Sequence, residues 1–257
     1  MRANGSTSKF VWYDQMSNDL PGSEDFYTKV VGWTLAPNTM NDQRYTLLQA
    51  GAAMIGGLMP IPEAAKGVRP AWMGYIAVDD VAAYADKVKA AGGAIHRPPT
   101  DIPNVGTFAV ASDPHGAGFL LFKGNSSEAP AQDPQAKGHI GWHELHAGDG
   151  ASDFAFYSGL FGWEKRDAMD MGAMGVYQTF ATKSGAQGGG VMTKMADTPA
   201  PHWLYYINVD AIDAAAERIA SAGGKLVVGP MQVPTGLWML QGLDPQGAVF
   251  GLLAPVR

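Results

Sequence analysis

The chain has 257 residues, 46% of them hydrophobic, so it is long enough for two ordinary domains with real cores. Its formal net charge of −6 disfavours binding to nucleic acid or to anionic membrane surfaces. The absence of cysteine excludes disulfides, thiolate zinc sites and cysteine nucleophiles. No apolar run approaches the length of a membrane span and residues 1–10 hold no signal-peptide core, so we expect a cytoplasmic protein.

The first segment of the chain predicts a β-α-β-β-β module. A strand at Phe10–Met16 leads into a helix near Leu20–Val31. Asp19 should cap that helix, because its carboxylate can accept from the free amides of the first turn, and Gly32 should end it. Short strands then follow at Arg44–Gln49 and Ala53–Met59.

The same pattern recurs in the next segment. A strand at Ala71–Val78 precedes an Ala-rich helix near Asp80–Ala91, with Asp79 as its expected cap and Gly92-Gly93 as its stop. Further strands are expected near Ala94–Arg97, Thr107–Ser112 and Gly118–Phe122. The polar stretch Lys123–Gly138 is typical of an exposed linker. We therefore expect domains at 8–123 and 139–255, joined by a linker at 124–138.

The second half of the chain repeats the first at a nearly constant offset. Trp12 corresponds to Trp142, and the later landmarks follow in the same order. These landmarks are Phe26-Tyr27 with Phe156-Tyr157, Gly32-Trp33 with Gly162-Trp163, Gly56-Gly57 with Gly189-Gly190, Trp72 with Trp203, and Asp113-Pro114-x-Gly116 with Asp244-Pro245-x-Gly247. The repeat places further helix caps at Asp149 and Asp210, so the chain contains four modules.

This four-module pattern resembles the vicinal oxygen chelate superfamily, which includes glyoxalase I, extradiol dioxygenases and the fosfomycin and bleomycin resistance proteins. The helix entries with Phe-Tyr, the Gly-Trp pairs and the Asp-Pro-x-Gly hairpins carry the resemblance. More narrowly, Gly141–Leu145 followed by Phe156–Trp163 is similar to a tandem two-domain subgroup labelled hydroxylase-like or 27 kDa antigen-like. The resemblance implies an α+β fold of tandem glyoxalase-like cups, each with eight strands around a ligand.

The resemblance also implies positions for a divalent metal on the first and last strands of each module. Those positions hold Trp12, Met73 and Leu120 in the first half, and Trp142, Leu204 and Gly251 in the second. The remaining position, near Gly56–Met59 and Gly189–Met192, offers only Gly, Leu, Val or Met. Because none supplies a hard oxygen or an imidazole, we predict neither a metal nor another cofactor.

Two acidic residues are candidates for catalysis. Asp14 and Glu144 each lie two positions after the repeated tryptophan, so both should face the inside of their cups. A buried carboxylate suits a general acid or base, but it can equally be a structural group that binds backbone amides or an arginine. Both interpretations stay open.

Three histidines precede the third predicted helix. Strand alternation places His139 and His143 on one face and His146 on the other, with Glu144, so no single cluster is expected. A surface or strand-end set is the simpler interpretation. A displaced metal site built from Glu144, His146 and a partner such as His202 remains an alternative.

The candidate ligand-binding residues are those expected on the inner faces of the first strands of the modules: Trp12, Met73 and Tyr75, and Trp142, His146, Leu204, Tyr206 and Asn208. This aromatic and apolar lining suits a flat or greasy molecule, although ordinary core filling explains it equally well. Gly188–Gly190 lacks the context of a phosphate loop and predicts a bulge or turn.

The leading hypothesis is a protein that binds a small apolar or aromatic molecule, with acid–base catalysis by Glu144 or Asp14. The alternatives are a metal-dependent glyoxalase- or dioxygenase-type enzyme with displaced ligands, and a protein-interaction module with filled cups. If it is an enzyme, a lyase, isomerase or oxygenase-like reaction is expected. A monomer or a homodimer would fit, without nucleic acid or membrane as a partner.

Overall fold

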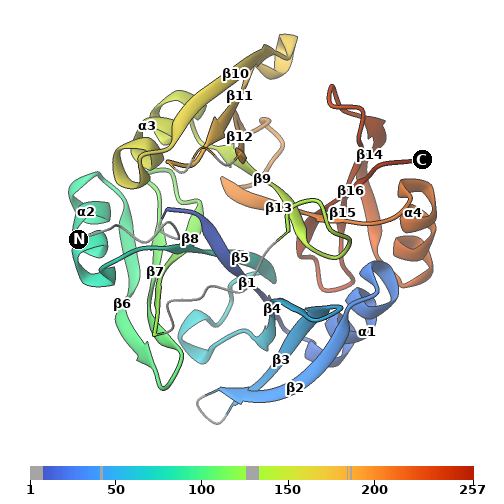
Figure 1. The fold of residues 1–257 in the computed structure, drawn as a ribbon, viewed down its shortest axis with the longest axis horizontal. Coiled ribbons are helices and arrows are strands. Elements are labelled where there is room, and N and C mark those ends of the chain that lie inside the picture. Colours follow the sequence, from blue (N-terminus) through green and yellow to red (C-terminus); the bar gives the residue numbers. More distant parts are fainter. Residues whose placement is uncertain (1–7, 41–42, 126–132, 184, 186) are drawn as a thin grey trace. The chain divides into compact units, whose positions relative to one another are not determined.

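The computed structural model describes residues 8–40, 43–125, 133–183, 185 and 187–257. Each half of the sequence supplies one sheet of eight strands (Figure 1). The strand order is β2-β3-β4-β1-β5-β8-β7-β6 in the first sheet and β10-β11-β12-β9-β13-β16-β15-β14 in the second. These sheets confirm the α+β fold of tandem glyoxalase-like cups, and each cup uses two consecutive modules.

The four modules have the same order of elements. The first contains β1 (Phe10–Ser17), α1 (Leu20–Val31), β2 (Thr34–Met40), β3 (Gln43–Ala50) and β4 (Ala53–Pro60). The second contains β5 (Ala71–Ala77), α2 (Val81–Ala90), β6 (Ala94–Ile102), β7 (Gly106–Ser112) and β8 (Gly118–Gly124). The third contains β9 (Ile140–Ala147), α3 (Gly150–Phe161), β10 (Glu164–Asp170), β11 (Val176–Ala181) and β12 (Gln187–Thr193). The fourth contains β13 (His202–Asn208), α4 (Ile212–Ser221), β14 (Lys225–Gln232), β15 (Trp238–Leu243) and β16 (Val249–Ala254).

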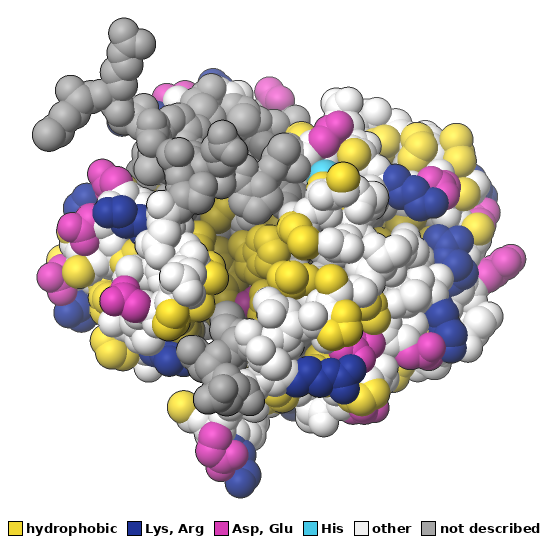
Figure 2. Space-filling model, turned by 60° about the horizontal axis from the view of Figure 1, so that its bottom comes forward, with side chains coloured by type: hydrophobic (Ala, Val, Ile, Leu, Met, Phe, Trp, Pro, Cys, Tyr) yellow, Lys and Arg dark blue, Asp and Glu magenta, His cyan; other side chains and the backbone are white. Residues whose placement is uncertain are grey.

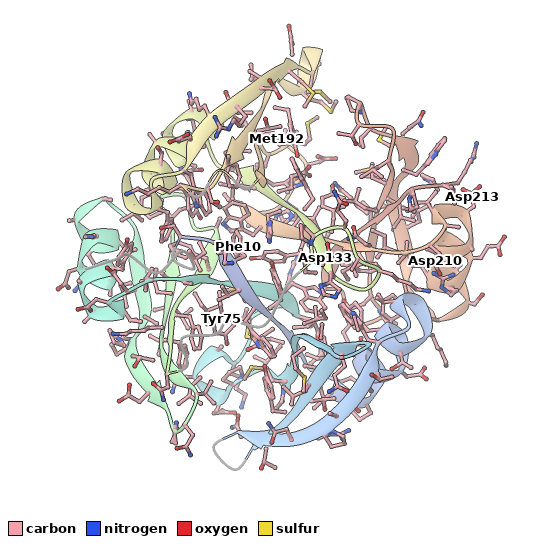
Figure 3. The ribbon with its side chains drawn as sticks, in the orientation of Figure 1. Phe10, Tyr75, Asp133, Met192, Asp210 and Asp213 are labelled. Atoms are coloured by element: carbon pink, nitrogen blue, oxygen red, sulfur yellow. The ribbon has the colours of Figure 1, made fainter. Side chains whose placement is uncertain are left out.

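Two of the four expected helix caps are confirmed and two are wrong. Asp19 accepts a hydrogen bond from the Gly22 amide at 3.1 Å, and Asp149 accepts one from the Ser152 amide at 2.8 Å. The helix α2 is capped by Asp80, one residue later than expected. The cap of α4 is Ala211, which makes no side-chain hydrogen bond. Asp210, labelled in Figure 3, pairs with Lys137 instead.

Two strands extend beyond what the sequence pattern predicts. The strand β2 is required by the β-α-β-β-β pattern, but the sequence did not locate it, and β6 runs on to Ile102 through two prolines. Proline cannot donate to a sheet ladder and is therefore confined to edges and bulges. Both strands are terminal in their sheet, which is why Pro37 in β2 and Pro98 in β6 are tolerated.

The chain forms two compact units that do not coincide with the two halves of the sequence. Unit 1 contains residues 1–12, 74–129 and 143–203, and unit 2 contains residues 13–73, 130–142 and 204–257. Unit 1 therefore includes α2 and α3, whereas unit 2 includes α1 and α4. Each unit takes one helix-bearing module from each half.

The repeated motif residues form a buried hydrogen-bonded chain inside each unit. In unit 2, Trp72 donates through Nε1 to the Tyr27 hydroxyl at 2.8 Å, and Tyr27 donates to Asp244 at 3.0 Å. Burial raises the pKa of that carboxyl group. In unit 1, Trp203 donates to Tyr157 at 2.9 Å, and Tyr157 donates to Asp113 at 3.2 Å.

In each of these two rows of hydrogen bonds, the tyrosine and the aspartate come from different halves of the sequence. The Phe-Tyr and Asp-Pro-x-Gly motifs are thus structural, and they join modules rather than bind a ligand. Trp72 and Trp203 are buried, as expected for core residues.

Positive and negative side chains are interspersed around the edge of the face drawn in Figure 2, and neither sign dominates it. Within the residues that the structure covers, no helix is long and apolar enough to span a membrane.

Candidate functional site

A carboxylate and an imidazole lie side by side on β9 in unit 1. Glu144 and His146 are two residues apart, so strand alternation directs both side chains to the same face. Glu144 Oε1 lies 2.9 Å from His146 Nε2, within hydrogen-bonding distance. Only 7% of Glu144 and 9% of His146 is exposed, so the pair is largely removed from water.

The second carboxylate oxygen of Glu144 is bound by a tyrosine from β11. The Tyr177 hydroxyl donates to Glu144 Oε2 at 2.8 Å. Gly190 of β12 pairs with Glu144 across the parallel strands, and a Cβ atom there would lie 2.2 Å from the Tyr177 hydroxyl. The glycine therefore leaves the space that this hydroxyl occupies.

A second imidazole covers the first. The rings of His146 and His202 are stacked with centroids 4.8 Å apart and planes inclined by 4°. The Nδ1 of His202 lies 3.0 Å from the Ala200 carbonyl, which can only accept, so this nitrogen carries a proton. Burial, followed by repulsion from His146, lowers the pKa of His202 below its ordinary value. His202 is therefore neutral at neutral pH.

The free nitrogen of His146 defines the chemistry of this arrangement. A carboxylate accepts hydrogen bonds, so in the neutral form of the ring a bond from His146 Nε2–H to Glu144 would leave the lone pair on Nδ1. That Nδ1 atom is buried and has no hydrogen-bond partner within the described residues. The arrangement provides a proton acceptor whose positive charge, once formed, is stabilised by a neighbouring carboxylate.

The first half contains the same carboxylate and tyrosine without the imidazoles. The Tyr45 hydroxyl donates to Asp14 Oδ1 at 2.6 Å, and Asp14 is 3% exposed. Gly57 pairs with Asp14, and its missing Cβ would lie 2.1 Å from the Tyr45 hydroxyl. Met16 and Ala71 occupy the positions of His146 and His202. The acid–tyrosine pair belongs to the common architecture, and the histidine pair exists only in the second half.

The other two histidines near β9 are held elsewhere, so the expected split of the set is confirmed. His143 stacks on Phe10 with centroids 4.4 Å apart, and its Nδ1 lies 2.7 Å from the Gly188 carbonyl. Burial lowers the pKa of His143 to about 4. His139 accepts the Asp133 amide through Nδ1. His139 and His146 lie at the two ends of β9, as the strand-end interpretation predicts, but both are buried, so a surface location is wrong.

The expected aromatic lining lies partly in unit 2. Leu204 and Tyr206 form an apolar cluster with Met239 and Leu253, and Trp142 packs against it. Gln241 donates to the Tyr206 hydroxyl at 2.7 Å. The Asn208 amide donates to the carbonyls of Pro134 and Ala136, so this side chain fastens the segment before β9.

The remaining lining candidates come from the first half. Tyr75 packs edge-on against Phe122 with centroids 5.8 Å apart. Trp12 and Met73 are partly exposed. These environments leave their proposed role in ligand binding as a prediction.

The residues present do not fit the divalent metal of the superfamily. The six counted positions carry Trp, Met, Leu and Gly side chains, which offer no hard donor. Within the described ranges, no group of three or more His, Asp or Glu side chains is arranged to hold a metal ion. Glu144, His146 and His202 were the possible displaced metal site. The rings of the two histidines are stacked in parallel, so their nitrogens do not point toward one common position.

Tyr177 is the member of the site that the sequence patterns did not identify. Its signal was available in the repeat, because Tyr177 corresponds to Tyr45 between Gly-Trp and Gly-Gly landmarks. His202 was named only as a possible partner of Glu144 and His146. Its place in the site depends on the pairing of β13 within the sheet, which the sequence does not specify.

The chain matches the Glyoxalase/Bleomycin resistance protein/Dioxygenase superfamily over residues 9–121 and 138–252, and it belongs to this family. It is 31% identical over 247 residues to the protein named "Putative glyoxylase CFP32" of Mycobacterium tuberculosis, covering 95% of this chain and 94% of that one. It is 28% identical over 260 residues to "Anthracycline biosynthesis protein DauV" of Streptomyces sp. strain C5, covering 95% and 92%.

Two solved structures support the fold. The Mn(II)-bound glyoxalase from Novosphingobium aromaticivorans has a TM-score of 0.68 and 18% identity, covering 98% of this chain and 83% of that one. The 2,3-dioxygenase LapB from Pseudomonas sp. KL28 has a TM-score of 0.67 and 12% identity, covering 98% and 93%. At this level of identity the similarity concerns the fold alone.

Proposed function

We propose that the third module carries a metal-independent proton-transfer site that acts on a small apolar or aromatic molecule. The observation that carries the proposal is the buried Nδ1 of His146, which has no hydrogen-bond partner among the described residues, while Nε2 lies within hydrogen-bonding distance of Glu144. A buried acceptor without a hydrogen bond costs free energy, about 1–3 kcal/mol, and a ligand that donates to it would recover that cost. The ligand should therefore present an O–H, N–H or acidic C–H group.

In the proposed step, His146 Nδ1 takes a proton from the ligand. The N–H bond forms as the ligand's X–H bond breaks, and the electron pair stays on the ligand. Glu144 stabilises the resulting imidazolium, and the proton returns to the same or a neighbouring atom of the ligand. His202, held neutral by its surroundings, adds no second positive charge beside the imidazolium.

The supporting test begins with a thermal-shift screen of small metabolites against the intact protein, because a ligand of the native state raises its melting temperature. Compounds that stabilise the protein are measured again with His146→Phe. Met16→Leu, at the equivalent position of the first half, is the matched control. Stabilisation should be lost in the first variant and retained in the second.

The bound compounds are then incubated in deuterated water and analysed by mass spectrometry. Deuterium incorporation that requires both Glu144 and His146, and that survives prior treatment with EDTA, is the expected result. Binding without exchange would indicate a sequestering protein instead. Exchange that disappears with EDTA, together with one equivalent of metal in tag-free protein, would overturn the metal-independent proposal.

A further inference from the structure

The Tyr177 hydroxyl is placed to control the orientation of the Glu144 carboxylate. A carboxylate at the end of a glutamate side chain can rotate about its last bond, and a rotation that turns its plane away from His146 would break the hydrogen bond to Nε2. Tyr177 holds the opposite oxygen at 2.8 Å, so it opposes that rotation. The resulting geometry fixes the proton of neutral His146 on Nε2 and leaves Nδ1 as the base.

We propose that Tyr177 is a positioning residue that sets the tautomer of His146 through Glu144, and that Gly190 is the clearance it needs. The inference rests on the proposed role of Glu144 and His146. Gly190 is paired with Glu144, and a methyl group there would meet the end of the Tyr177 side chain at 2.2 Å. Since a tyrosine can swing aside, the added methyl displaces the hydroxyl rather than the strand.

The first half supplies an internal control for this proposal. Asp14, Tyr45 and Gly57 repeat the three positions with the same contacts. Met16 stands where His146 stands in the second half, so that copy has no tautomer to set. A purely structural role would give both copies the same response to mutation, whereas a positioning role would change the imidazole only in the second half.

The test measures the ring nitrogens of His146 by ¹⁵N nuclear magnetic resonance in the intact protein at neutral pH. His146→Gln identifies its signals among those of the six histidines. In the wild type, the two nitrogen shifts should be widely separated, as in a single Nε2–H tautomer. In Tyr177→Phe they should move toward each other, as in a tautomer mixture, and in Tyr45→Phe they should stay at their wild-type values.

Gly190→Ala tests the same point with the tyrosine retained. It should reproduce the shift of Tyr177→Phe, and the double variant should change no further, because both substitutions remove the same hydrogen bond. Gly57→Ala is the matched control and should leave the His146 signals unchanged. If Tyr177→Phe does not fold, this second pair of variants decides the question.

Unchanged His146 shifts in a folded Tyr177→Phe or Gly190→Ala variant would overturn the proposal, as would equal shifts from the first-half variants. The result is independent of the proposed reaction. A tautomer change without ligand-dependent deuterium exchange would keep Tyr177 as a positioning residue and reject proton transfer. Deuterium exchange without a tautomer change would support proton transfer and reject Tyr177 as a positioning residue.

Discussion

At the scale of single residues, the strongest repeated motifs of this chain serve packing. Tyr27 accepts from Trp72 and donates to Asp244, and Tyr157 does the same with Trp203 and Asp113. The tryptophan N–H groups are buried, so they depend on these hydroxyls. The motifs that identify the family therefore form part of the buried core, and the proposed proton-transfer site depends on other residues.

We expect Tyr27→Phe to destabilise the protein by about 1–3 kcal/mol, because the buried Trp72 N–H loses its partner. Tyr157→Phe should cost a similar amount through Trp203. Urea unfolding of each variant measures the change in free energy. A loss below about 0.5 kcal/mol for both variants, within the range of ordinary surface substitutions, would contradict this interpretation.

His143 should make stability depend on pH. Its pKa is lowered from 6.5 to about 4 by burial, so between these values the unfolded chain binds a proton that the folded chain excludes. As pH falls from 6.5 to 4, the protein should therefore lose about 3 kcal/mol through this group. His143→Tyr, which installs the residue found at Tyr13, should remove this part of the pH dependence. Urea unfolding at several pH values measures it, and parallel profiles would show that His143 is not responsible.

At the scale of helices and strands, the differences between sequence and structure concern neighbouring residues. Asp79 and Asp80 are both suitable caps by type, but only Asp80 has its carboxylate within 2.9 Å of a first-turn amide, that of Ala83. The sequence cannot show which of two adjacent aspartates caps the helix, because that depends on the residue at which β5 ends.

The Asp80→Ala variant should lose about 1 kcal/mol of stability, because the first turn of α2 loses its cap. Asp79→Ala is the control with the same change of charge, and it should alter stability by less than about 0.5 kcal/mol. Thermal or urea unfolding compares the two. Equal losses would mean that charge, and not capping, accounts for the effect.

The sequence predicted the modules because helix caps, glycine stops and hydrophobic periodicity are local signals. It did not locate β2, because Pro37 is unusual within a strand, and only the sheet shows that this strand lies at an edge. Gly188–Gly190 was expected as a bulge or turn. The bulge is confirmed: these residues lie inside β12, and the register with β11 shifts between Phe180 and Ala181, so Gly188 is skipped in the strand pairing.

For the candidate site, strand alternation correctly placed Glu144 and His146 on one face. Tyr177 and His202 reach them from other strands, and such contacts depend on strand pairing. Pairing is a property of the whole sheet, and no local pattern in the sequence records it. The sequence therefore named His202 only as one possible partner, and the contact of Tyr177 with Glu144 became visible only in the structure.

At the scale of the whole molecule, sheets and compact units divide the chain differently. Each sheet belongs to one half of the sequence, whereas each compact unit combines a module from both halves. The expected domain boundaries at 8–123 and 139–255 follow the halves and stay a prediction. A half separated from the rest retains its strands but loses the packing partners of its helices.

We therefore expect fragments 1–129 and 130–257 not to fold as isolated monomers. Fragment 1–129 lacks Asp244, the acceptor of Tyr27, and fragment 130–257 lacks Asp113, the acceptor of Tyr157. Mixed in equal amounts, the fragments should recover the near-ultraviolet circular dichroism of the intact chain. Sedimentation and cooperative unfolding of each fragment provide the check. A monomeric fragment that unfolds cooperatively would show that the sheet is the folding unit.

The joining of modules from both halves also bears on how such a chain can specialise. Two identical halves would form the same units as a symmetric dimer, and every side chain in a pocket would then occur twice. Once the halves are covalently linked, one copy can change without the other. Met16 and Ala71 occupy the equivalent positions of His146 and His202 in the first half, so the imidazole pair occurs only in the second half. Broken symmetry leaves one copy to maintain the scaffold while the other is free to acquire chemistry.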